Sequence, residues 1–229
     1  MESIILHLNI YDSHDRAVRS IESVIANDIK DIDASTEIHA TSDGRVQVDI
    51  TGEDDEFCAN YLLGKYGSPI KKAEVGETYK GYIHSIGEDG IVVDIGIKVN
   101  ITPDGLKPLG TGEVKQIALR FGIIPHLPVS IEIVKVDGDT KVCFTKKQVD
   151  LWWKWKKSGT DRVIANAVTR SELKAAIKKT GHARDIYGIE RMGIMEHAIV
   201  CREKTDGPGI VADIGPLLRS DLGVIVKRA

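Results

Sequence analysis

The sequence is poor in aromatic residues, in cysteine and in long apolar runs. Only 5% of its 229 residues are aromatic, yet all three tryptophans fall within residues 152–155. Cys58, Cys143 and Cys201 lie far apart and form no CxxC pair, which excludes a disulfide framework and a zinc knuckle. No apolar run approaches the roughly 18–20 residues of a membrane span, and the N-terminus lacks the basic flank of a secretory signal. We therefore expect a cytoplasmic chain without a membrane partner.

Motifs of catalysis and of metal binding are also missing. The seven histidines show neither HxH nor HExxH spacing, which argues against a transition-metal site. The sequence contains no GxSxG, no P-loop and no GxGxxG, the motifs of common hydrolases and nucleotide-binding enzymes. We expect no catalytic residue, no metal and no cofactor. Catalysis by residues distant in sequence would leave no motif, and that alternative stays open.

The net charge of -3 conceals an uneven distribution along the chain. Residues 1–69 carry 14 acidic and 5 basic side chains, a net charge of -9. The segments 70–159 and 160–229 each carry a net charge of +3. Basic surface in the last two thirds suits an anionic partner, and the acidic first third suits a basic protein partner.

The two ends of the chain show the same order of elements. Residues 1–69 alternate as β-α-β-β-α, with a short closing strand expected at residues 69–73. Residues 160–229 read as β-α-β-β-α-β, with Ser171 capping the first helix and Gly181 following its end. We predict a ferredoxin-like α/β sandwich at each end.

The middle segment, residues 70–148, predicts a different architecture. Its short strands are separated by glycine-rich turns, and a single short helix precedes the last two strands. Five strands in that order describe an OB-fold barrel. A linker helix is expected over residues 149–159. The predicted fold class is therefore α+β and multidomain, with two ferredoxin-like domains flanking a five-stranded OB barrel.

Two families are suggested by motifs in this sequence. The central segment resembles the S-one RNA-binding domain, through VGETYKGYI (75–83), SIGEDGIVVDIG (85–96) and the residues around Val134 and Asp137. The whole chain resembles an archaeal family defined as a domain of unknown function, through Glu196-His197-Ala198, Cys201 and TDGPGI (205–210). The first resemblance implies RNA binding by an OB barrel. The second implies an archaeal context but no activity.

The S-one pattern is incomplete at two positions that usually stack on bases. Val92 and Asn100 stand where that domain commonly has an aromatic residue and a histidine. Since base stacking is worth about 1–3 kcal/mol per base, this loss weakens the expected RNA affinity. A reduced RNA-contacting face is predicted instead from four residues on the first and third strands of the barrel: Lys80, Tyr82, His84 and Lys98.

The segment LWWKWKKSG (151–159) mixes every tryptophan with a cluster of lysines. At helical spacing Trp152 and Trp155 share a face that can pack on the barrel, while the lysines stay in water. Trp153 points elsewhere and is available for a nucleic-acid contact. This linker and the two lysines that precede it therefore add six residues to the predicted RNA-binding surface: Lys146, Lys147, Trp153, Lys154, Lys156 and Lys157.

The turn TDGPGI is the last candidate site. Its glycines flank a proline at a helix start, so free backbone N–H groups could hold an anion or a small ligand. It resembles the ligand-binding turn of amino-acid-sensing ACT domains, although it precedes the second helix here rather than the first. The alternative is an ordinary helix start. The candidate residues are Thr205, Asp206, Gly207 and Gly209.

These features together favour a non-catalytic protein that binds RNA or a ribonucleoprotein in the archaeal translation, RNA-processing or transcription machinery. Two alternatives are kept. One is a small-ligand regulatory protein that uses the TDGPGI turn. The other is a protein-interaction adaptor whose barrel has lost RNA binding. The sequence leaves the oligomeric state, the particular RNA and the protein partner open.

Overall fold

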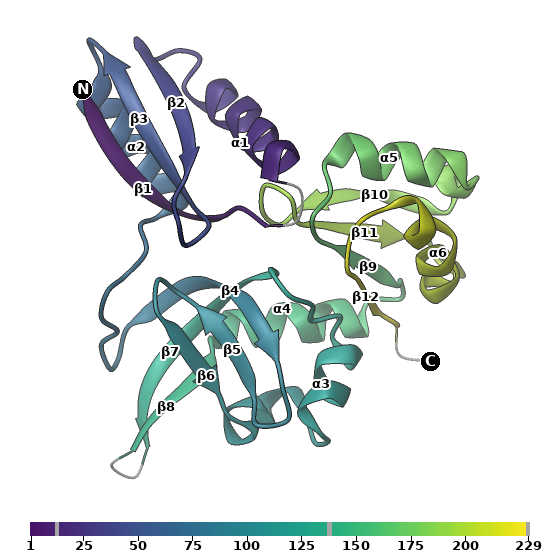
Figure 1. The fold of residues 1–229 in the computed structure, drawn as a ribbon. Helices are drawn as coiled ribbons and strands as arrows, with labels where there is room; N and C mark the ends of the chain where they lie inside the picture. Colours follow the sequence, from purple (N-terminus) through teal and green to yellow (C-terminus); the bar gives the residue numbers. More distant parts are fainter. Residues whose placement is uncertain (12–13, 137–138, 228–229) are drawn as a thin grey trace. The chain divides into compact units, whose positions relative to one another are not determined.

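The computed structural model describes residues 1–11, 14–136 and 139–227. The protein is a mixed α+β structure with three sheets (Figure 1). The chain divides into two compact units, Met1–Lys71 and Lys72–Ala229. The acidic first third of the sequence is thus a separate unit, whereas the two basic segments share the other.

The first unit holds a three-stranded antiparallel sheet in the order β1-β3-β2. Val48 lies opposite Ile4 on one neighbouring strand and Ile38 on the other, so one face of the sheet is apolar and is covered by both helices. The predicted strand at residues 69–73 is wrong, because that stretch has no ladder partner. The elements are β1 (Glu2–Asn9), α1 (His14–Asp28), β2 (Ala34–Ala40), β3 (Arg45–Gly52) and α2 (Asp55–Tyr66).

The second unit begins with a curled half-barrel of five antiparallel strands in the order β6-β5-β4-β7-β8. The edge strands β6 and β8 approach each other, with η1 packed against both. A Cβ on Gly105 of η1 would lie 2.6 Å from the carbonyl oxygen of Val142 and 2.9 Å from Ile101 Cγ2, so only glycine fits there. The elements are β4 (Thr78–Ile86), β5 (Ile91–Asp94), β6 (Lys98–Ile101), η1 (Pro103–Leu109), α3 (Val114–Arg120), β7 (Pro128–Val136), β8 (Asp139–Phe144) and α4 (Lys146–Lys157).

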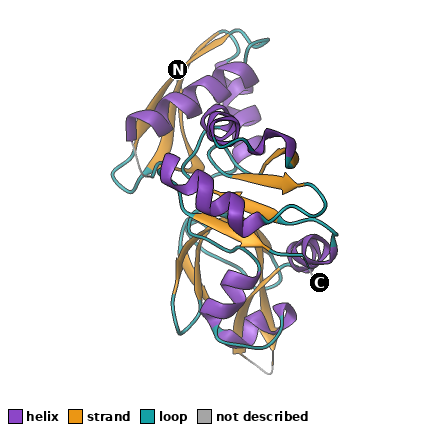
Figure 2. Ribbon diagram, turned by 90° about the vertical axis from the view of Figure 1, so that its right-hand side faces the viewer, coloured by secondary structure: helices purple, strands orange, loops and turns teal. Residues whose placement is uncertain are grey.

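The third sheet has four antiparallel strands in the order β10-β11-β9-β12. Leu173 and Ile177 of α5, with Ile210 and Ile214 of α6, pack with Val163 and Ile199 of the strands in one buried core. Figure 2 draws the chain turned by 90° about the vertical axis from Figure 1, with helices in purple and strands in orange. The elements are β9 (Arg162–Ala165), α5 (Arg170–Lys179), η2 (His182–Arg184), β10 (Ile186–Arg191), β11 (His197–Cys201), α6 (Gly207–Ile214), η3 (Gly215–Leu217) and β12 (Leu222–Ile225).

Helix α5 is capped by Thr169, two residues before the predicted cap Ser171. The Thr169 hydroxyl accepts a hydrogen bond from the Glu172 backbone N–H, and the Glu172 carboxylate accepts one from the Thr169 backbone N–H. This reciprocal capping box satisfies two backbone donors at once, whereas Ser171 could satisfy only one. The predicted end is confirmed, since Gly181 adopts a left-handed conformation with φ of 85°.

The half-barrel and the third sheet meet backbone to backbone. A Cβ on Gly223 of β12 would lie 2.8 Å from the carbonyl oxygen of Gly122, and a Cβ on Gly122 would lie 3.1 Å from Ile225 and 3.3 Å from Ile164. The sheet thus has α5 and α6 on one face and the α3 end of the half-barrel on the other (Figure 1). These two halves form one packed body, which explains why they belong to one unit.

Candidate functional site

The predicted RNA-contacting face of β4 is only partly exposed. Ile83 points inward and is fully buried, as predicted, and Lys80 and His84 are exposed on the outer side. Lys98 on β6 is exposed as well and lies opposite Asp94 in the ladder. Tyr82 shares this side but is largely buried, so less of its ring is accessible for stacking on a base than the sequence predicted.

Tyr82 lies near the turn before β11. Burial raises the pKa of Tyr82 far above its usual value, and the nearby carboxylate of Glu196 raises it further. The turn also approaches β7, because a Cβ on Gly193 would lie 3.2 Å from Pro128 Cγ. Glu196 belongs to the Glu-His-Ala motif that was noted in the sequence and is itself buried. That motif therefore helps to join the two halves of the second unit.

The two positions that depart from the S-one pattern lie side by side. Val92 and Asn100 are opposite each other on β5 and β6. The Asn100 side chain donates to the carbonyl oxygen of Asp89, 3.3 Å away, and its Oδ1 lies 2.5 Å from where a Cβ on Gly90 would be. Asn100 thus supports the β4–β5 turn, and neither position supplies a ring that can stack.

Helix α4 packs its tryptophans on the half-barrel. Trp152 is fully buried, with its ring centroid 4.8 Å from that of Phe144, and Trp155 is 7% exposed, as the shared helical face predicted. Trp153 also packs on the barrel, edge-on to Phe121, and its Nε1–H donates to the carbonyl oxygen of Pro108 at 3.0 Å. Trp153 is therefore held by structural contacts, although part of its ring remains accessible.

The lysines of α4 lie on the side of the helix that faces solvent. Lys146, Lys147, Lys154 and Lys157 are exposed, and none forms an ion pair with another described residue. Lys157 Nζ lies 5.8 Å from the centroid of the Trp153 ring. Lys156 differs, because its Nζ donates to the carbonyl oxygen of Val226 at 2.7 Å. Four of the five lysines are thus free for an anionic partner.

The TDGPGI turn borders a cavity of about 460 Å³. Thr205, Asp206 and Gly209 line it, but Gly207 is buried and does not. The backbone N–H of Gly207 donates to Asp161 Oδ2 at 2.9 Å, while Lys227 N–H donates to Asp161 Oδ1 at 2.8 Å. A carboxylate of the chain therefore already occupies one of the donors on which the predicted anion site depended.

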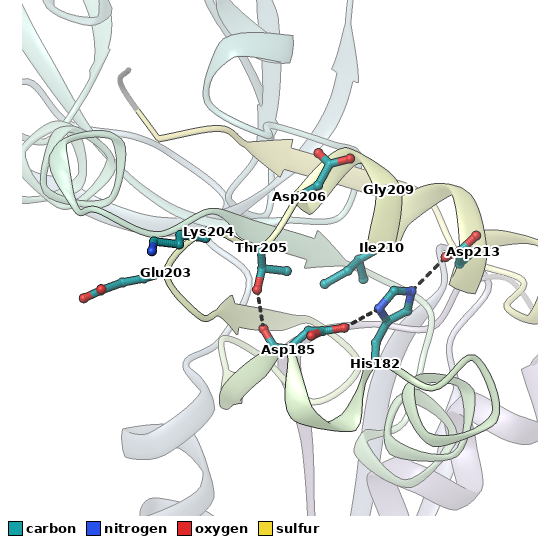
Figure 3. A pocket seen from close by; sticks show the side chains of 9 residues that line it. All are labelled: His182, Asp185, Glu203, Lys204, Thr205, Asp206, Gly209, Ile210 and Asp213. Carbon is teal, nitrogen blue, oxygen red and sulfur yellow. Dashed lines mark hydrogen bonds and ion pairs between the residues drawn. The ribbon is translucent and has the colours of Figure 1, made fainter.

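The lining of this cavity is acidic rather than basic. Four carboxylates face two cationic or titratable groups, and Figure 3 shows His182 between Asp185 and Asp213, with Glu203 and Lys204 at the other side. This distribution of charge favours a cationic group over an anion. The complete lining is His182, Asp185, Glu203, Lys204, Thr205, Asp206, Gly209, Ile210 and Asp213.

His182 joins two elements across the cavity. Its Nδ1 lies 2.8 Å from Asp185 Oδ2, and its Nε2 lies 2.8 Å from Asp213 Oδ2 on α6. Since both ring nitrogens face carboxylates, the protonated ring satisfies both contacts. The hydrogen bonds to Asp185 and then Asp213 raise the pKa of His182. Sequence reasoning missed this cluster, for which only the spacing of His182 and Asp185 was a local signal.

A second polar cluster lies between the half-barrel and the third sheet. The buried Asn166 donates from Nδ2 to the carbonyl oxygen of Pro125 at 2.7 Å and accepts from Asp221 N–H at 2.9 Å. Burial lowers the pKa of the neighbouring His126, against the raising effect of Asp221 and with a further lowering by His84. His84 is thus an exposed residue at the edge of this cluster.

Neither a metal site nor a membrane-spanning helix is found in the described part of the chain. Over residues 1–11, 14–136 and 139–227, no group of three or more His, Cys, Asp or Glu side chains is placed to hold a metal ion. Within the same ranges no helix combines the length and apolar content that crossing a bilayer requires.

These observations define a multidomain α+β protein in which a curled five-stranded half-barrel is joined to a four-stranded sheet and preceded by an acidic three-stranded unit. Models of the N-terminal, central and C-terminal domains of DUF2110 match residues 3–72, 73–156 and 160–226. The chain belongs to the DUF2110 family. No curated protein matches it.

Proposed function

We propose that this protein binds RNA or a ribonucleoprotein without catalysing a reaction, and that α4 provides the main contact. On this proposal the protein acts in the translation, RNA-processing or transcription machinery of an archaeal cytoplasm. The protein would contact RNA phosphates rather than stack on bases, because Tyr82 is largely buried and Trp153 is hydrogen-bonded to Pro108.

The observation that carries this proposal is the free lysine row on a rigidly held helix. Trp152 and Trp155 anchor α4 in the core, so the backbone that carries the lysines is already ordered before RNA binds. Lys146, Lys147, Lys154 and Lys157 are exposed and lack a described acidic partner. Cations arranged along a fixed helix suit the regular spacing of backbone phosphates.

The strand order supports an OB-type assignment for the half-barrel. The first strand, β4, pairs with both β5 and β7, while the two edge strands approach each other. A five-stranded, partly open Greek-key barrel with these pairings is a common nucleic-acid-binding architecture. Lys80, His84 and Lys98 would extend the α4 surface if the RNA reaches the outer side of β4, β5 and β6.

The flanking sheets support ferredoxin-like assignments in the same way. The order β10-β11-β9-β12 with α5 and α6 on one face follows the split β-α-β plan. The order β1-β3-β2 in the first unit follows the same plan without its last strand. Because residues 1–69 carry a net charge of -9, we assign the first unit to a basic protein partner rather than to RNA.

The test is fluorescence anisotropy of a labelled single-stranded RNA titrated with the full chain at two salt concentrations. We expect binding that weakens steeply with salt, since each phosphate contact releases counterions and contributes about 0.7 to the slope. The double variant K154E/K157E should weaken binding at both salt concentrations and lower the slope by about 1.4.

A charge-matched control for the single variants Lys154→Glu and Lys157→Glu is Lys115→Glu on α3. Lys115 is exposed but lies 3.4 Å from Glu88, outside the proposed surface, so this change should leave the affinity within about twofold. If Lys115→Glu weakened binding as much as either single α4 variant, net charge alone would account for the effect. No binding even at low salt would refute the RNA proposal and favour the adaptor alternative.

The acidic cavity supports a second candidate, a small-ligand sensor. Its volume suits a compact metabolite, and the carboxylates of Asp185, Asp206 and Asp213 suit a ligand with an ammonium group. A ligand that binds only the folded state raises the unfolding temperature, and the stabilisation grows with the logarithm of the ligand concentration once that exceeds Kd. Free amino acids and polyamines should therefore stabilise the native chain more than the Asp206→Asn variant if this candidate is correct.

A further inference from the structure

Helix α2 of the first unit exposes two aromatic side chains on one face. Phe57 is 62% exposed and Tyr61 is 39% exposed. The two are four residues apart, so they lie one helical turn from each other on the same side. The opposite side, formed by Cys58, Ala59 and Leu62, already covers the sheet. The aromatic pair therefore does not contribute to the core of this unit.

Gly64 continues the same face, and nothing in the described fold requires a glycine there. It lies seven residues after Phe57 and three after Tyr61, which places it on the same stripe. A Cβ at Gly64 would meet no atom within 4 Å. Glycine is unfavourable inside a helix compared with alanine, so its presence is not explained by folding. An absent side chain does create a shallow space where a partner can approach the helix closely.

The surroundings of this face are negatively charged. Glu53, Asp54 and Glu56 are exposed at the N-terminal end of α2. At the other end Lys65 is already paired, since its Nζ lies 2.5 Å from Asp28 Oδ1. A second copy of this acidic unit would be repelled, whereas a basic partner would be attracted.

We propose that Phe57, Tyr61 and Gly64 form the docking face for a basic protein segment that carries an apolar side chain among lysines or arginines. The aromatic rings would supply the desolvated centre of the contact, the glycine would allow close approach, and the carboxylates would supply the charged rim. This inference rests on the protein-binding role proposed above for the acidic unit, and it is independent of RNA binding by α4.

The test uses a fluorescein-labelled, 14-residue amphipathic peptide of leucine and lysine, with the same peptide carrying glutamate in place of lysine as a control. The full chain should bind the lysine peptide and not the glutamate peptide. Phe57→Ser should weaken binding at least about fivefold. Gly64→Gln should also weaken it without lowering the unfolding temperature, because glutamine favours a helix more than glycine does.

These two substitutions leave the net charge unchanged, so a loss of affinity reports contact rather than long-range attraction. Leu119→Ser on α3, where Leu119 is 72% exposed, is the matched control and should change nothing. Equal binding by all variants would overturn the proposal. So would sedimentation that shows a dimer of the chain lost in Phe57→Ser, because the occupant would then be a second copy. Failure of RNA titration alone would leave this docking face standing.

Discussion

At the scale of single residues, Asp161 acts as a ligand supplied by the chain itself. It is 3% exposed, and its two oxygens accept the backbone N–H groups of Gly207 and Lys227. One carboxylate thus ties the start of α6 to the end of the chain after β12. The favourable interaction of a negative charge with a helix N-terminus adds to these hydrogen bonds.

We predict a graded loss of stability at this position. Asp161→Ala leaves the buried N–H of Gly207 and the partly buried N–H of Lys227 unpaired, at roughly 1–3 kcal/mol for the buried donor and less for the other. Asp161→Asn keeps one acceptor and should lose less. Urea unfolding followed by tryptophan fluorescence measures both. Equal stability of the alanine variant and the native chain would show that water replaces the carboxylate at no cost.

His182 predicts a dependence of stability on pH. Its folded pKa is raised above the usual 6.5 by Asp185 and Asp213, so the folded state binds its proton more tightly than the unfolded state does. The extra stability is fully present below about pH 6.5 and is lost as the pH rises through the folded pKa. The thermal midpoints of the native chain and His182→Gln should therefore differ more at pH 6 than at pH 9.

A variant of Asp213 tests the same prediction from the other side of the contact with His182. Asp213→Asn removes one of the two carboxylates that raise the pKa, so it should shift the loss of stability to lower pH without abolishing it. NMR titration of the His182 ring follows the same proton directly. A His182 pKa at or below 6.5 would contradict the proposed geometry.

At the scale of elements, two tryptophans of α4 differ in how much they contribute to stability. Trp152 is fully buried between Phe121 and Phe144, so Trp152→Ala should cost about 3–5 kcal/mol. Trp153 is partly exposed and donates a single hydrogen bond to Pro108, so Trp153→Phe should cost only about 1 kcal/mol. Chemical denaturation of each variant checks the ranking. A similar loss for both would mean that Trp153 is as deeply engaged as Trp152.

The sequence predicted the elements well because their periodicity is local. The alternation of Ile83 with its neighbours and the helical spacing of Trp152 and Trp155 fixed the inward faces correctly. Thr169 was not predicted as the cap, because Ser171 is an equally suitable cap by residue type and only the reciprocal bonding with Glu172 favours Thr169. The partial burial of Tyr82 was not predicted, because the turn near it, which carries Glu196, lies more than a hundred residues later in the chain. The cluster of His182, Asp185 and Asp213 was not predicted, because Asp213 lies 31 residues after His182 and only the fold brings the two together.

At the scale of the whole molecule, three family domains correspond to two compact units. The central and C-terminal domains share the contacts of Gly122 with Gly223, of Asn166 with Pro125 and of Lys156 with Val226. The N-terminal domain is a unit of its own. The chain therefore has three sequence domains but only two units that are expected to unfold independently.

This difference predicts unfolding in two steps. All three tryptophans lie in the second unit, so tryptophan fluorescence reports only that unit, whereas far-UV circular dichroism reports both. The two signals should give different midpoints in urea, and a fragment of residues 72–229 should reproduce the fluorescence transition of the full chain. Coincident curves for both probes would instead indicate a single cooperative body.

The meeting of Gly122 and Gly223 has a consequence for how the family can vary. In most packed interfaces a larger side chain on one surface can be compensated by a smaller one on the other. Here neither residue has a side chain to reduce, and a Cβ on Gly223 would lie 2.8 Å from the Gly122 carbonyl oxygen. Related sequences should therefore keep glycine at both positions independently, without the paired exchanges that mark ordinary contacts, and the two halves should be inherited together.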